Sequence, residues 1–277
     1  VDPAEFRELV KIRKGVAYSP TALDTTIARM ENLAIKKGLN FLTVEPRIVR
    51  NPESQTLDVV FVLTKGPRVF VERIDIEGNA TTIDKVVRRQ FRTAEGDPFN
   101  PREIRQSAER IRALGYFATA DVNARGGTAE DQVIVDVNVE EKTTGSLNFG
   151  ASYSVSDGIG FNIAFTESNF LGRGQYLNVK VGTTADNKES GITFIEPSLL
   201  DRDLKLKLSA WYNTSENANA RYSTNRLGFS PSLEFPLAER TRLELRYKIS
   251  SDEILDVDVN SSPILKAEEA LGSQITS

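Results

Sequence analysis

The chain has 277 residues, a net charge of −4 and neither histidine nor cysteine. Without a basic excess it is not expected to bind nucleic acid. Without histidine or cysteine it cannot form a Ser-His-Asp or Cys-His nucleophile, or a zinc site built from these residues. Its 39 carboxylates show no spacing that indicates catalysis. The longest apolar run, 59–63, is far shorter than the roughly 20 residues of a membrane helix.

The first 143 residues contain one pattern twice. Ser19-Pro20 is matched 81 residues later by Asn100-Pro101. Each pair predicts a helix start, because the first side chain caps free amide groups and proline suits the first helical position. Apolar residues then recur on one face of each predicted helix. Gly38 and Gly115 are predicted to end the two helices.

Each of these helices is predicted to have a shorter helix before it and two strands after it. The shorter helices are expected to open at Asp2-Pro3 and to cover 82–91. The second copy also has a leading strand, 69–79, which the first copy lacks. The repeated unit is therefore β-α-α-β-β. We expect one such domain at 1–66, cut before its first strand, and a complete one at 67–143.

After residue 142 the helical period gives way to alternation between apolar and polar residues, which is typical of strands. In "LNFGASYSV", 147–155, every second residue is apolar or aromatic. The same alternation places Tyr212 on the apolar face of its strand and Trp211 on the other face. Alternation alone is compatible with a soluble β-sandwich as well as with a membrane barrel. Seven strands are predicted, at 145–155, 159–167, 174–185, 190–196, 203–214, 221–235 and 240–251.

Five phrases, in order along the chain, resemble the BamA family of outer-membrane protein insertases, most closely its alphaproteobacterial versions. They are "VERIDIEGN" (71–79), "VVRRQFRTAEGDPFN" (86–100), "ERIRALGYF" (109–117), "VEEKTTGSLNFGASYS" (139–154) and "ESNFLGRGQ" (167–175). The resemblance implies α+β POTRA domains, each β-α-α-β-β, followed by part of an antiparallel transmembrane β-barrel at 144–277. That barrel is expected to be incomplete, because seven strands are fewer than the family has. At Asp201 the family pattern leads us to expect glycine.

The resemblance also implies a location and a function. The protein is expected in the bacterial outer membrane, with residues 1–143 in the periplasm. Its partners would be unfolded outer-membrane protein clients, membrane lipid and outer-membrane lipoproteins of the BamD type. No cofactor and no enzymatic activity are expected, because the free energy would come from folding of the client.

Three candidate sites follow from the resemblance. Glu95 matches an acidic residue that contacts the partner lipoprotein in the family; the alternative is an ordinary solvated carboxylate in a turn. The barrel seam, or lateral gate, where a client strand would pair, comprises Gly145, Ser146, Leu147, Asn148, Phe149, Gly150 and Ala151. Small residues there predict weak packing across the seam, or simply accommodate curvature. An edge of the second POTRA domain that would receive clients by strand addition comprises Ala118, Thr119, Ala120, Asp121 and Val122.

Other classes of protein remain as alternatives. A secretion or translocation pore of the related POTRA-barrel type would have the same architecture. An outer-membrane lipase or protease barrel typically uses a nucleophile assisted by histidine, and this chain has no histidine. A soluble β-sandwich with two α+β arms would keep 144–277 in solution without detergent.

Overall fold

The computed structural model describes residues 3–39, 41–155, 158–217, 222–238 and 241–277. Asp2, the expected start of the first helix, lies outside the described residues. By contacts the chain divides into two compact units. The first comprises Val1–Gly78, Arg88–Ala113 and Thr119–Val139, and the second comprises Asn79–Val87, Leu114–Ala118 and Glu140–Ser277.

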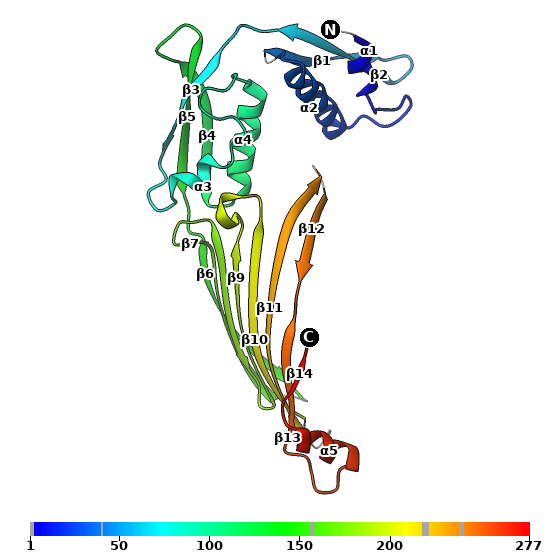
Figure 1. Cartoon of the computed structure of the whole chain (residues 1–277), viewed down its shortest axis with the longest axis vertical. Coiled ribbons are helices and arrows are strands. Elements are labelled where there is room, and N and C mark those ends of the chain that lie inside the picture. The colour runs from blue at the N-terminus through cyan, green and yellow to red at the C-terminus, as the bar shows by residue number, and fades with distance from the viewer. Residues whose placement is uncertain (1–2, 40, 156–157, 218–221, 239–240) are drawn as a thin grey trace. The chain divides into compact units, whose positions relative to one another are not determined.

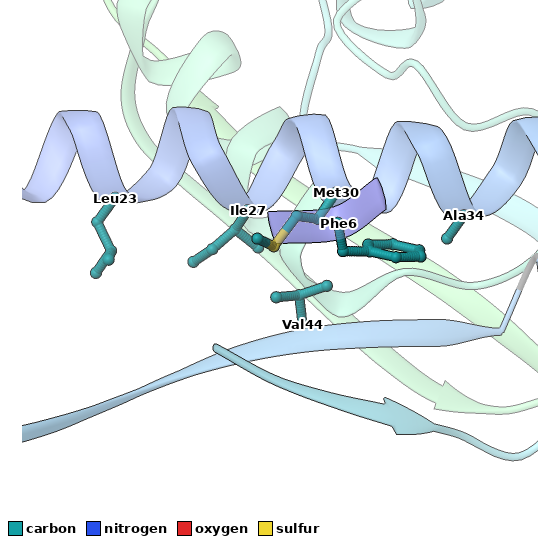
Figure 2. Packing of buried hydrophobic residues seen from close by; sticks show 6 residues of the cluster. All are labelled: Phe6, Leu23, Ile27, Met30, Ala34 and Val44. Carbon is teal, nitrogen blue, oxygen red and sulfur yellow. The ribbon is translucent and has the colours of Figure 1, made fainter. Parts of the chain in front are cut away.

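The N-terminal part of the chain forms two helices and a hairpin around a small apolar core. Its elements are α1 (Pro3–Glu8), α2 (Pro20–Lys36), β1 (Leu42–Asn51) and β2 (Thr56–Lys65). The Ser19 hydroxyl accepts a hydrogen bond from the amide of Ala22, so the predicted cap is confirmed. Figure 2 shows one face of α2 turned toward Val44 of β1, with Phe6 of α1 beside it. The core residues are Phe6, Leu23, Ile27, Met30, Ala34 and Val44.

The second repeat adds the leading strand that the first lacks. Its elements are β3 (Phe70–Glu77), α3 (Asp84–Arg88), α4 (Pro101–Ala113), β4 (Phe117–Gly126) and β5 (Gln132–Glu141). The order β-α-α-β-β is the predicted one, although α3 is shorter than the expected 82–91. The Asn100 side chain caps α4 by accepting from the amide of Arg102. The three strands form a sheet in the order β3-β5-β4, with β3 and β5 parallel.

A long antiparallel sheet follows, in which successive strands lie side by side (Figure 1). In the described part of the chain its order is β14-β13-β11-β10-β9-β8-β7-β6, and β12 also pairs with β11. The strands are β6 (Gly145–Ser154), β7 (Gly158–Phe170), β8 (Gln175–Thr183), β9 (Asn187–Glu196), β10 (Lys205–Asn217), β11 (Tyr222–Ala238), β12 (Thr241–Arg246), β13 (Ile249–Leu255) and β14 (Gln274–Thr276). A short 3-10 turn, η1 (Leu199–Asp201), joins β9 to β10.

The register of this sheet separates an apolar face from a polar one. One ladder of directly opposite residues runs Leu147, Phe165, Val179, Ile192, Ala210, Phe229 and Ile249. The adjacent ladder runs Asn148, Ala164, Lys180, Gly191, Trp211, Gly228 and Ser250. Trp211 therefore lies on the polar face and Tyr212 on the apolar face, as predicted. Because the apolar ladder is largely exposed, this face lacks the cover that a soluble sandwich would provide.

The last part of the sheet departs from the predicted strands. The expected strand 240–251 is interrupted between β12, which ends at Arg246, and β13, which begins at Ile249. Opposite this interruption lies Pro231 of β11, which has no N–H to donate. The amide of Tyr247 still donates to the carbonyl of Pro231. Position 240 itself lies outside the described residues. Helix α5 (Pro263–Leu271) and strand β14 were not predicted. Ser262 caps α5 before a proline, which is the same signal that identified the earlier helices. Among the described residues, no helix combines the length and the hydropathy needed to cross a membrane.

Candidate functional site

Strand β6 is an edge of the long sheet. It pairs with β7 over its whole length, from Gly145 opposite Glu167 to Ser154 opposite Gly158. No other strand pairs with it in the part of the chain that the structure describes. Its second side therefore presents backbone N–H and C=O groups that an added strand can bind. The seven residues predicted to pair with a client strand all lie on this edge.

The two faces of β6 differ as the sequence predicted. Leu147 and Phe149 are 56% and 72% exposed on the apolar face. Ser146 and Asn148 alternate with them and pair with Thr166 and Ala164 of β7. An added strand would therefore be set in register by backbone bonds, with its side chains alternating between the same two faces.

The glycines of β6 accommodate side chains of β7, whereas weak packing across the seam stays a prediction. A β-carbon at Gly150 would lie 2.1 Å from Oδ1 of Asn162, and one at Gly145 would lie 2.7 Å from Oε2 of Glu167. Side chains of β7 thus cover the two glycines on the side of the strand that pairs with β7. The glycines admit polar side chains from β7 next to the free edge.

The three-stranded sheet has one open edge and one covered edge. The predicted edge 118–122 lies in β4, the outer strand of the order β3-β5-β4. At the opposite edge, the segment 96–99 forms backbone bonds with β3: the amide of Val71 donates to Asp97, and that of Gly96 to Val71. Strand addition is therefore better suited to β4. Its Ala120 is nevertheless buried, so only the backbone and the outward-facing side chains are accessible.

Glu95 stabilises the covered edge of β3. Its Oε1 accepts hydrogen bonds from the amide of Ile74 at 3.1 Å and from Nη1 of Arg88 at 3.0 Å. Arg88 Nη2 donates in turn to the carbonyl of Ile74 at 3.1 Å. The Glu95 side chain remains 48% exposed. It therefore has a structural role, which the sequence analysis missed, and it keeps an exposed carboxylate that a partner can contact.

At Asp201, where the family pattern led us to expect glycine, the chain forms the turn between β9 and β10. Leu200 and Asp201 have positive φ angles, 54° and 61°, where glycine is usually favoured. Aspartate tolerates this conformation better than most residues. The turn therefore has the backbone geometry for which glycine was expected, without the glycine. No group of acidic residues suited to a metal ion occurs among the described residues.

A β-α-α-β-β unit followed at once by a long antiparallel sheet with one exposed apolar face defines a class of protein. It is the class in which POTRA domains precede an outer-membrane β-barrel. Family comparisons agree with both parts. Residues 69–142 match the POTRA model, described as a surface antigen variable number repeat, and residues 169–277 match the Omp85 superfamily domain.

Individual relatives narrow the class. The chain is 29% identical over 240 residues to the outer membrane protein assembly factor BamA of Nitratidesulfovibrio vulgaris, covering 87% of this chain and 30% of that protein. It is 26% identical over 279 residues to BamA of Neorickettsia risticii, covering 100% of this chain and 37% of that protein. The crystal structure of Haemophilus ducreyi BamA lacking POTRA domains 1–3 matches with a TM-score of 0.60 and 25% identity, over 91% of this chain and 49% of that one.

The chain is thus similar to the BamA proteins along most of its length, and its two parts match the POTRA and Omp85 models separately. It spans about a third of the length of these curated relatives. Its long sheet is part of an outer-membrane barrel, and its POTRA domain, 69–142, lies in the periplasm. The predicted fold class and location are confirmed.

Proposed function

We propose that this protein is an outer-membrane protein assembly factor, which receives unfolded β-barrel clients in the periplasm and folds them into the outer membrane. The observation that carries the proposal is strand β6, the first strand of the sheet, which follows β5 directly and pairs with β7; in a closed barrel its other side would face the last strand across the seam. A free edge next to lipid is costly, because backbone groups there have no water to bind. When the seam opens, a client strand that pairs with β6 would remove this cost.

Recognition by the backbone suits a factor with many clients. Main-chain hydrogen bonds along residues 145–151 depend little on the client sequence, whereas the alternation of faces selects strands with one apolar face. No cofactor or enzymatic step enters this mechanism. Burial of the client's apolar face in lipid and closure of its strand ladder supply the free energy.

The periplasmic domains would act before the barrel. The open edge of β4, 118–122, would hold an unfolded client by the same strand addition. The exposed carboxylate of Glu95 would pair with a cationic residue of a BamD-type lipoprotein. Both roles extend the proposed function and each has its own test.

Single cysteines in the full-length protein test the seam directly, because this chain has none of its own. Ser146→Cys, Asn148→Cys and Ser152→Cys lie on the polar face of β6, whereas Leu147→Cys and Phe149→Cys lie on the apolar face. We expect these cysteines to crosslink to a stalled client that has one cysteine in its terminal strand. For a fixed client cysteine, the yield should alternate with a period of two residues.

The alternative of a secretion pore predicts a different result. A translocating chain would meet the polar face of several strands, so cysteines in β10 (Lys205–Asn217) would crosslink as well as those in β6, without alternation. Strong crosslinks from β10 and none from β6 would refute the assembly function. The likeness to CdiB of Acinetobacter baumannii, with a TM-score of 0.51 and 15% identity, shows a shared fold alone.

A further inference from the structure

A network of hydrogen bonds joins the turn between β7 and β8 to the segment 81–83 that precedes α3, within one compact unit. Glu141, the last residue of β5, accepts from the amides of Thr81 at 3.0 Å and Thr82 at 2.6 Å. The Thr82 hydroxyl accepts from Nδ2 of Asn169 at 2.8 Å. Oδ1 of Asn169 accepts from the amide of Gly174 at 2.7 Å. Three side chains thus connect segments that lie far apart in the sequence.

The network is buried where its side chains meet. Thr82 is 2% exposed and Asn169 is 8% exposed. Water cannot replace a lost partner at such positions, so each bond that is removed leaves an unsatisfied polar group. Tyr116, which is also buried, donates its hydroxyl to the carbonyl of Gly174. The turn is therefore held from two sides by side chains outside the long sheet.

The backbones of the two segments also touch. The amide of Ile83 donates to the carbonyl of Gly172 at 2.9 Å. Gly172 has a φ of +69°, and a β-carbon there would lie 2.0 Å from the carbonyl oxygen of Thr81. The preceding Leu171 has a φ of +54°, which is unusual for leucine, although its side chain is exposed. Strain of this kind persists where surrounding contacts impose it, and functional sites are where it concentrates.

The same turn reaches the start of the edge strand. The backbone N–H of Asn169 donates to Oε1 of Glu167 at 2.8 Å. Glu167 is opposite Gly145, the first residue of β6, and its other oxygen lies over that glycine. Ser168 adds bonds from its amide and its hydroxyl to the carbonyl of Thr144, at 3.2 and 3.0 Å. Residues 167–169 therefore bond both to the segment 81–83 and to the beginning of β6.

We propose that Asn169, Thr82 and Glu141 form a latch that fixes the Gly145 end of β6, with Asn169 as the positioning residue. With the latch closed, β6 keeps its register on β7 and offers an incoming strand a template in a fixed position. With the latch open, the first residues of β6 can slip, and a slip of one residue exchanges its two faces. The role in client assembly rests on the proposed function, whereas the latch itself does not.

Amide hydrogen exchange of the full-length protein in lipid nanodiscs tests the latch. Asn169→Ala removes the central side chain, and Thr82→Val removes one hydroxyl at constant size. Thr82→Ser restores the hydroxyl and is the conservative rescue. The matched control is Asn178→Ala, which removes an Asn–Thr bond of the same length that joins β8 to Thr166 of β7 and lies outside the latch.

We expect about tenfold faster exchange at Thr82, at Gly174 and at residues 145–148 in Asn169→Ala and Thr82→Val. Thr82→Ser and Asn178→Ala should exchange like the unmodified protein at these positions. Unchanged exchange at Thr82 and Gly174 in both latch variants would overturn the latch. Faster exchange there without any change at 145–148 would overturn the positioning role.

Client crosslinking separates this inference from the proposed function. In the latch variants, crosslinks from the β6 cysteines should lose their two-residue alternation. If exchange at 145–148 rises as expected but no client crosslinks to β6 in any variant, the latch is supported and the proposed assembly function fails. The two ideas therefore have distinguishable failures.

Discussion

Glu95 has two roles to separate, because it is the proposed lipoprotein contact and it also supports the edge of β3. Glu95→Gln keeps an amide oxygen for the Ile74 N–H and removes the charge. Glu95→Lys removes both the acceptor and the charge, and it places a cation next to Arg88. The pair of variants therefore distinguishes loss of a partner from loss of the fold.

The contacts set the size of each effect. The Glu95–Arg88 pair is 48% and 42% exposed, so its loss costs at most about 1 kcal/mol. Leaving the part-buried Ile74 amide without an acceptor costs a further ~1–3 kcal/mol. A domain of this size loses about 4–8 °C of melting temperature per kcal/mol. We expect a drop of roughly 4–32 °C for Glu95→Lys and under about 8 °C for Glu95→Gln.

Two measurements complete this test. Circular dichroism follows thermal unfolding of the periplasmic segment, and titration measures its affinity for a BamD-type lipoprotein. Loss of a desolvated charge pair costs about 2–5 kcal/mol, so Glu95→Gln should bind at least about 30-fold more weakly. Glu109→Gln is the control, because it removes an exposed carboxylate paired with Arg112. Binding of Glu95→Gln at the unmodified affinity would refute the partner role and leave Glu95 purely structural.

Two further predictions concern folding and pH. Residues 69–142 alone should melt cooperatively, and Gly78→Ala should lower the melting temperature of this segment much more than Gly96→Ala; aggregation of the segment or equal effects would contradict this. The two glycines have φ angles of +91° and +89°, but only at Gly78 would a β-carbon meet a backbone carbonyl, at 1.8 Å. Burial disfavours the charged form of Glu141, but hydrogen bonds from Thr82 and Thr81 outweigh it and lower the pKa of this carboxyl. The ionised Glu141 therefore stabilises the fold fully at pH values above the pKa of an unfolded glutamate, near 4.3. This stabilisation is lost as the pH falls through the lower pKa of the folded state. In acid, the Thr82 amide should therefore lose its protection from hydrogen exchange. Glu141→Gln should remove that pH dependence, and an unaltered profile in this variant would contradict the assignment.

Local signals in the sequence were sufficient for most of the elements. Caps before proline and the glycines that end helices act within one turn of the chain, so Ser19-Pro20 and Asn100-Pro101 were enough to locate α2 and α4. Alternation acts at a period of two residues, so it assigned the faces of the long strands and the opposite orientations of Trp211 and Tyr212. Helix α5 has the same Ser-Pro start, but the polar residues around it favour a loop, so the local pattern does not predict it.

Long-range contacts were beyond the reach of these signals. Alternation assigns residues to faces but does not name neighbouring strands, so it left open whether lipid or a second sheet covers the apolar face. Register and exposure showed that no second sheet does so in the described chain. The same limit hid the bond from Glu95 to the Ile74 amide and the latch of Asn169, Thr82 and Glu141. The partners in these bonds are 21 to 87 residues apart in the sequence. A buried polar side chain needs a hydrogen-bond partner, but the local sequence does not indicate which distant residue that partner is.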